Sequence, residues 1–164
     1  MDQDERKKLI AQYRDGYAAI AEALLKITEE ELDARPGPGR WTVREIVHHL
    51  ADSEMTAGIR LRRLLAEDHP EIKGYDQDEF ARRLYYDRPH ETSLELFKYV
   101  RDSTAEILDR MQPADWLREG THSEMGRYTT ETWLTVYGAH AHKHALQIRA
   151  ARDAARKEMV QKSG

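Results

Sequence analysis

Four long stretches of the chain repeat apolar residues every three or four positions, which is the spacing of an amphipathic α-helix. They begin near Glu5, Thr42, Thr92 and Thr129. A helix with one apolar face must bury that face against another element, and no run of alternating residues predicts a strand. We therefore expect an all-α four-helix bundle without a sheet, formed as a single domain by residues 1–164.

Capping patterns and unpatterned segments predict where these helices begin and how they are connected. A threonine followed three residues later by glutamate, which is the capping-box pattern, occurs at Thr28, Thr42 and Thr92. The long connection between the second and third helices is expected to contain a short helix over residues 77–84. Residues 117–127 hold two glycines and show no periodicity, so a loop is expected there.

Composition excludes several classes of protein. The net charge is -4, and lysine and arginine are interleaved with aspartate and glutamate, so no basic stripe predicts nucleic-acid binding. The chain has no cysteine, which rules out disulfides, thiolate zinc sites and a cysteine nucleophile. No segment approaches the roughly 18 apolar residues of a membrane span. The acidic start lacks the features of a secretory signal, and a cytoplasmic protein is expected.

The strongest chemical signal is a pair of histidines in the last helix, His140 and His144. Each residue turns a helix by about 100°, so these two side chains lie on one face about 40° apart. Two imidazoles one turn apart can both reach one metal ion, although a hydrogen-bonded core pair has the same spacing. Two ligands leave a divalent ion under-coordinated, so a third must come from elsewhere. His142 points to nearly the opposite side and is expected in solvent.

The second helix offers two candidates for that third ligand, His48 and His49. His49 lies at the edge of the apolar face, whereas His48 and Asp52 point more towards solvent. The periodicity therefore favours His49, for which a boundary histidine with a backbone partner is the alternative. Glu45 and His48 match the Glu-x-x-His element of di-iron bundles, but that element must occur twice and no second copy is found.

Glu54 is unusual because it falls inside the apolar stripe of the second helix. Burying a carboxylate is costly unless it is paired. Glu54 could accept a hydrogen bond from Arg60 or from a tyrosine, could bond to a ligand histidine, or could act as an acid or base. It is therefore the candidate catalytic residue of the sequence.

Two segments resemble the signature motifs of the DinB/YfiT-like superfamily. The first runs from Arg40 to Glu54 with the sequence RWTVREIVHHLADSE, and the second is His140-x-x-x-His144-x-x-Gln147-Ile148. The connection around Tyr75-Asp76-Gln77-Asp78 is similar to the YfiT branch. The resemblance implies a four-helix bundle of unusual connectivity that is generally dimeric.

The resemblance also implies a zinc or nickel ion held by His49, His140 and His144. It implies either a metal-dependent hydrolase or an S-transferase that uses a low-molecular-weight thiol such as bacillithiol or mycothiol. Thiol transfer is favoured over hydrolysis, because hydrolysis benefits from a nearby base and the sequence does not establish one, Glu54 being the one inward carboxylate. Gln147 is the candidate cofactor-binding residue, and the expected substrate is a small molecule. The alternatives are a hydrolase with a metal-activated water and a non-catalytic metal-binding module of a stress response.

Overall fold

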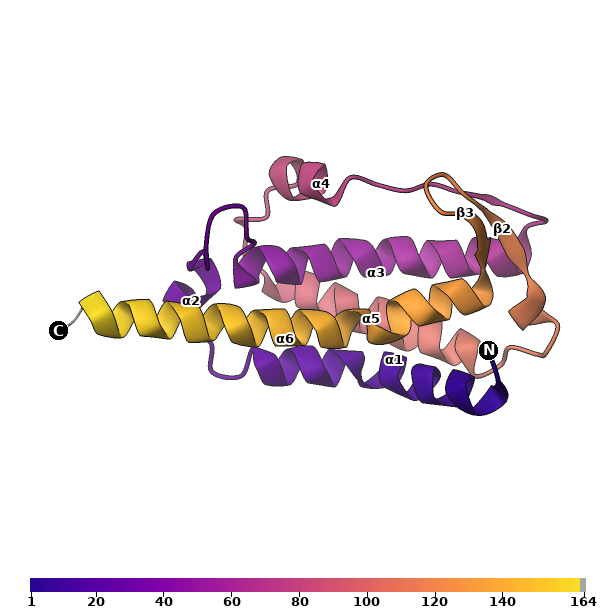
Figure 1. The fold of residues 1–164 in the computed structure, drawn as a ribbon, viewed down its shortest axis with the longest axis horizontal. Helices are drawn as coiled ribbons and strands as arrows, with labels where there is room; N and C mark the ends of the chain where they lie inside the picture. The colour runs from indigo at the N-terminus through magenta and orange to yellow at the C-terminus, as the bar shows by residue number, and fades with distance from the viewer. Residues whose placement is uncertain (163–164) are drawn as a thin grey trace.

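The computed structural model describes residues 1–162, in which long helices run along one common axis (Figure 1). The long helices are α1 (Gln3–Ala23), α3 (Val43–Ala66), α5 (Glu91–Leu108) and α6 (Thr130–Lys162). The short ones are α2 (Glu29–Asp33), α4 (Gln77–Arg83) and the 3-10 turn η1 (Asp115–Leu117). The predicted four-helix bundle is confirmed, and so is the short helix in the connection after α3. Residues 163–164 of the predicted single domain lie outside the described part.

The order of the helices around the bundle explains the long connection between α3 and α5. α1 packs against α5 and α6, and α3 packs against the same two helices. Figure 1 shows that α3 and α5 run in one direction, whereas α1 and α6 run in the other. After α3 ends, the chain must therefore return along the whole bundle before α5 begins, and residues 67–90 cover that distance.

The expectation of a bundle without a sheet is wrong, because residues 117–127 contribute to strands rather than forming a plain loop. β2 (Glu119–His122) and β3 (Gly126–Thr129) form an antiparallel hairpin, and β1 (Glu71–Ile72) pairs in parallel with β2. These strands have two to four residues, which is too short for a detectable alternation. The sheet lies at one end of the bundle beside α3 and the start of α6, not at its centre (Figure 1).

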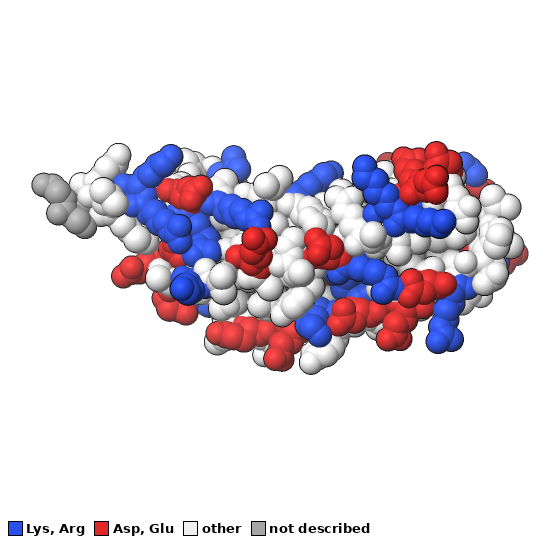
Figure 2. All heavy atoms as spheres, turned by 90° about the horizontal axis from the view of Figure 1, so that it is seen from below, with Lys and Arg blue, Asp and Glu red and all other residues white. Residues whose placement is uncertain are grey.

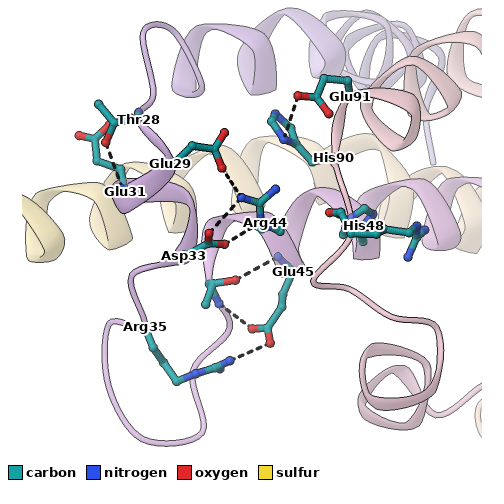
Figure 3. A network of polar contacts seen from close by, with 12 residues as sticks. Thr28, Glu29, Glu31, Asp33, Arg35, Arg44, Glu45, His48, His90 and Glu91 are labelled. Carbon is teal, nitrogen blue, oxygen red and sulfur yellow. Dashed lines mark hydrogen bonds and ion pairs between the residues drawn. The ribbon is translucent and has the colours of Figure 1, made fainter.

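Two of the three predicted capping boxes form. The side chains of Thr28 and Thr42 cap α2 and α3, each with the reciprocal bond from the glutamate three residues later. The predicted box at Thr92 is wrong, since the N-cap of α5 is His90, two residues earlier, and it has no side-chain cap within the described residues. Figure 3 shows this end of the bundle, where Arg44 of α3 donates to Glu29 and Asp33 of α2.

The core consists of two apolar clusters, one towards each end of the bundle. One includes Ile20, Val43 and Ile148, and the other includes Leu61 and Trp133. The buried pair of Glu54 on α3 and Arg101 on α5 forms a polar layer between them along these helices. None of the helices within residues 1–162 combines the length and apolar character needed to cross a membrane.

Candidate metal centre

The histidines that the sequence pattern grouped lie together in the structure. His49 comes from α3, and His140 and His144 come from α6. One ring nitrogen of each histidine lies within 4.8 Å of those of the other two. The ring centroids are 4.5 Å apart for His140 and His144, 4.9 Å for His49 and His144, and 5.5 Å for His49 and His140. Within residues 1–162, this is the one cluster of three potential metal-ligating side chains.

Local helix geometry and close helix packing together create this cluster. His140 and His144 are one turn apart, which places them on the same face of α6. That face meets α3, and the buried small residues Ala51, Ala141 and Ala145 lie in the same core cluster. The ring contacts of His49 with both histidines of α6 show that α3 and α6 meet at this face. The ring of Trp41 packs against His49 with centroids 4.7 Å apart and covers that side of the site.

Gln147 fixes the tautomer of His144. The Nδ1 atom of His144 lies 2.9 Å from Oε1 of Gln147, and because an amide oxygen can only accept, Nδ1 carries the proton. The lone pair of a neutral His144 is then on Nε2, which lies 3.1 Å from Nε2 of His140. An outer partner of this kind orients a ligand histidine in metal sites. The structure thus gives Gln147 a positioning role, while contact with a cofactor stays a prediction.

The hydrogen-bonding potential of the three rings is incompletely satisfied by the protein. The Nδ1 atoms of His49 and His140 are buried and have no hydrogen-bond partner in the described part of the chain. Buried polar atoms nearly always have partners, so atoms without one call for an explanation. Neutral imidazole nitrogens converging on one point fit a divalent cation such as zinc or nickel.

Burial keeps these histidines neutral. Desolvation, together with the neighbouring histidines, lowers the pKa of His49 to about 3 and that of His140 to about 2. Desolvation also lowers the pKa of His144, against the effect of its hydrogen bond to Gln147, which raises the pKa. Imidazole binds a metal ion in its neutral form, so the site is in the binding-competent protonation state at neutral pH.

Three neighbouring residues do not lie where the sequence pattern placed them. His48 was expected in solvent but is fully buried, with its ring nitrogens bonded to Ser93 and to the backbone carbonyl of Arg88. Asp52 was expected at the surface but is buried and accepts a hydrogen bond from Tyr86. The segment before α5, which covers this side of α3, could not be located from periodicity. His142 is half-buried, with Nε2 3.1 Å from the backbone oxygen of Gln12.

Glu54 is held by partners that the sequence did not identify fully. Its carboxylate is 1% exposed, forms an ion pair with Arg101 and accepts a hydrogen bond from Tyr13. The tyrosine was among the expected partners, whereas Arg101 rather than Arg60 supplies the positive charge. Burial raises the pKa of Glu54, and the charge of Arg101 together with both hydrogen bonds opposes that rise. A catalytic role for Glu54 stays a prediction.

The bundle and its histidine cluster place this chain in the class of helical-bundle proteins with a candidate three-histidine metal centre. Residues 12–148 match the model of the DinB superfamily, and the chain belongs to that superfamily. The resemblance inferred from the two sequence motifs is therefore confirmed.

Relatives of this chain are named for metal-dependent hydrolysis. A protein of Oceanobacillus iheyensis, provisionally named a metal-dependent hydrolase, is 34% identical over 129 residues, which cover 79% of this chain and 75% of that protein. One of Geobacillus thermodenitrificans with the same provisional name is 33% identical over 154 residues, covering 91% of this chain and 85% of the relative.

A solved structure shares the fold. YfiT from Bacillus subtilis is described as a probable metal-dependent hydrolase with an unusual four-helix bundle topology. It superposes with a TM-score of 0.85 at 27% identity, over 96% of this chain and 90% of that chain.

Proposed function

We propose that this protein is a metal-dependent enzyme whose divalent ion is held by His49, His140 and His144. The observation that supports it most directly is the convergence of three ring nitrogens within 4.8 Å of one another. Three protein ligands leave a coordination position free, which is the arrangement of catalytic rather than structural sites. A bound ion would lower the pKa of a thiol or a water molecule at that position and so make it nucleophilic at neutral pH.

For the reaction, we propose transfer of a low-molecular-weight thiol to an electrophilic small molecule. In the case of a halide substrate, a sulfur–carbon bond forms as the carbon–halogen bond breaks, the thiol proton passes to solvent and the halide is released. The histidines hold the ion, Gln147 keeps His144 in the correct tautomer, and Trp41 limits access of water. Hydrolysis benefits from a free general base near the attacking water, whereas Glu54 is engaged by Arg101 and Tyr13.

Hydrolysis by a metal-activated water is the second candidate, and the provisional names of the relatives favour it. A non-catalytic metal-binding module is the third. Purified protein with zinc or nickel restored would be assayed for conjugation of a thiol to 1-chloro-2,4-dinitrobenzene and for hydrolysis of a nitrophenyl ester. Metal-dependent conjugation supports transfer and metal-dependent ester cleavage without thiol supports hydrolysis. If the protein shows neither activity across a panel of thiols and esters, the non-catalytic metal-binding module is favoured.

Metal binding itself is tested by titrating the metal-free protein with zinc or nickel. We expect one ion per chain, no stoichiometric binding in His140→Ala, and unchanged binding in His142→Ala, because the His142 ring bonds to the backbone of α1. Stoichiometric binding that survives His140→Ala would refute the proposed centre.

For the assembly, we propose a homodimer, on the basis of the family resemblance. Large apolar side chains of α3 and α5 that are exposed in a single chain support it, among them Ile59 and Tyr99, which are 59% and 63% exposed. Light scattering at high micromolar concentration tests it, and a monomeric mass would contradict it.

A further inference from the structure

Arg60 of α3 is a buried cation without an acidic partner among the residues that the structure describes. In the described part of the chain four arginines are buried, each at most 9% exposed, and three of them pair with carboxylates. Arg44 pairs with Asp33 and Glu29, Arg101 with Glu54, and Arg152 with Glu31. By contrast, no carboxylate oxygen within residues 1–162 lies within 4.0 Å of a nitrogen of Arg60.

The contacts of Arg60 are all with uncharged groups. Its Nη1 donates to the hydroxyl of Tyr137 at 2.9 Å, and its Nη2 donates to the backbone carbonyl of Lys73 at 2.5 Å. Its Nε is buried and has no hydrogen-bond partner within residues 1–162. The buried carboxylates of the same helix are engaged elsewhere, Asp52 with Tyr86 and Glu54 with Arg101.

An uncompensated buried charge is costly, and proteins rarely keep one without a use for it. The planar guanidinium group suits a carboxylate or phosphate, which it can bind through two parallel N–H donors. The Tyr137 hydroxyl already accepts from Arg60, and its own proton meets no acceptor among the hydrogen bonds of the described residues. An anion at this place would satisfy both unpaired donors together with the charge.

Arg60 and Tyr137 lie beside the candidate metal centre. Tyr137 precedes His140 by three residues on α6, just under one helical turn. The Tyr137 and His140 rings are in edge contact, with their centroids 6.0 Å apart. One small molecule could therefore place an anionic group on Arg60 and a reacting atom at the histidines.

We infer that Arg60, with Tyr137, binds a carboxylate or phosphate group of the small molecule that reacts at the three-histidine site. This inference rests on the proposed function for the reacting end of that molecule. It narrows the substrate or thiol class to anionic compounds in which several bonds separate the anionic group from the reacting atom.

Two thiols of equal length test the inference with the zinc-loaded protein, 6-mercaptohexanoate and the neutral 6-mercaptohexanol. We expect calorimetry to show that the carboxylate thiol binds about tenfold more tightly, or more, than the neutral thiol. Charge-assisted hydrogen bonds are stronger than those between neutral groups. Arg60→Gln should remove this preference while still binding the neutral thiol. Arg60→Lys should keep part of it, because it retains the charge but not the planar fork.

Arg62→Gln is the matched control, since Arg62 belongs to the same helix but donates to Ser103 and Thr104 of α5. This variant should keep the full preference for the carboxylate. Equal binding of both thiols by the wild-type protein, or a preference that survives Arg60→Gln, would overturn the inference.

A metal-free measurement separates failure of this inference from failure of the proposed function. Hexanoate should raise the thermal midpoint of the metal-free wild-type protein by a few degrees above that in chloride at equal ionic strength. Arg60→Gln should lose this increase. Suppose that neither thiol binds the zinc-loaded protein, but hexanoate stabilises the metal-free protein in a way that depends on Arg60. The anion site is then supported and the thiol chemistry is refuted. If hexanoate stabilises both proteins equally, the anion site falls.

Discussion

At the scale of single residues, the polar layer between the two apolar clusters depends on charges that must stay paired. Glu54 and Arg101 are each 1% exposed, and Arg101 also donates to the backbone carbonyls of Tyr13 and Tyr137. Gly16 of α1 makes room for the guanidinium group, since a Cβ atom there would lie 2.7 Å from Nε of Arg101. The pair thereby links α1, α3, α5 and α6 at one level of the bundle.

Arg101→Met should lower the free energy of unfolding by about 3–5 kcal/mol, because it leaves the buried carboxylate of Glu54 without its cation. Urea denaturation measures this loss. The double variant Glu54→Leu with Arg101→Met should recover much of it, since no buried charge is then unpaired. Arg63→Gln is the control. Its partner Glu67 is exposed, and the stability should stay the same within error. An Arg101→Met protein as stable as the wild type would show that the pair is dispensable.

The buried histidines predict how stability depends on pH. Desolvation lowers the pKa of His48, His49, His140 and His144 from the ordinary value of about 6.5. Below that pH these histidines bind protons in the unfolded chain but stay neutral in the folded chain. These neutral histidines therefore contribute fully to the stability of the metal-free protein at neutral pH. Their contribution is lost as the pH falls towards their lowered pKa values.

Each such histidine contributes at most about 1.4 kcal/mol per pH unit below about 6.5. Urea denaturation of the metal-free protein between about pH 7.5 and about pH 5 should show this decline. A His49→Gln variant should show a shallower slope, because one titrating group is gone. Stability that does not change across this range would contradict the assignment of neutral buried histidines.

At the scale of elements, the helix starts depend on whether a side chain actually caps them. The hydroxyl of Thr42 accepts from the backbone of Glu45 at 3.2 Å, whereas Thr92 lies exposed inside the first turn of α5. A cap satisfies backbone N–H groups that have no partner within the helix, so its removal leaves them unpaired.

Thr42→Ala should therefore cost about 0.5–2 kcal/mol of stability, and Thr92→Ala should cost much less. Thermal or urea unfolding of the two variants side by side measures the difference. Equal losses would mean that α5 begins at Thr92 after all, as its sequence pattern suggests.

At the scale of the whole molecule, charges of both signs are distributed over the surface and form ion pairs between helices. The face in Figure 2 shows acidic and basic side chains interspersed rather than gathered by sign. Ion pairs of this kind join α1 to the neighbouring helices, such as Arg6 with Glu131 of α6 and Glu22 with Arg149 of α6. Each exposed pair contributes little by itself.

A metal ion should stabilise the whole bundle more than these pairs, because its ligands come from both α3 and α6. Free zinc at a hundredfold excess over its dissociation constant should add about 2.7 kcal/mol and raise the thermal midpoint accordingly. Differential scanning calorimetry measures the increase. His140→Ala should lose it and His142→Ala should keep it. The same increase in both variants would place the ion somewhere other than the histidine cluster.

The sequence by itself determined the features that depend on neighbours along the chain. The four helices follow from the spacing of apolar residues, the cap of α3 from Thr42 and Glu45, and the shared face of His140 and His144 from helical geometry. These features are local, because each involves residues only three or four positions apart.

The tertiary structure decided the features that depend on distant segments. The pairing of Glu71 with Thr121 forms a small sheet that no local pattern announces. The burial of His48 depends on the segment before α5, and the partner of Glu54 comes from a helix 47 positions away. The same holds for Arg60, because only the packing of the other described segments around it shows that none of them supplies an acidic partner. Helical periodicity predicts which way a side chain points, but the packing of the helices decides what it meets.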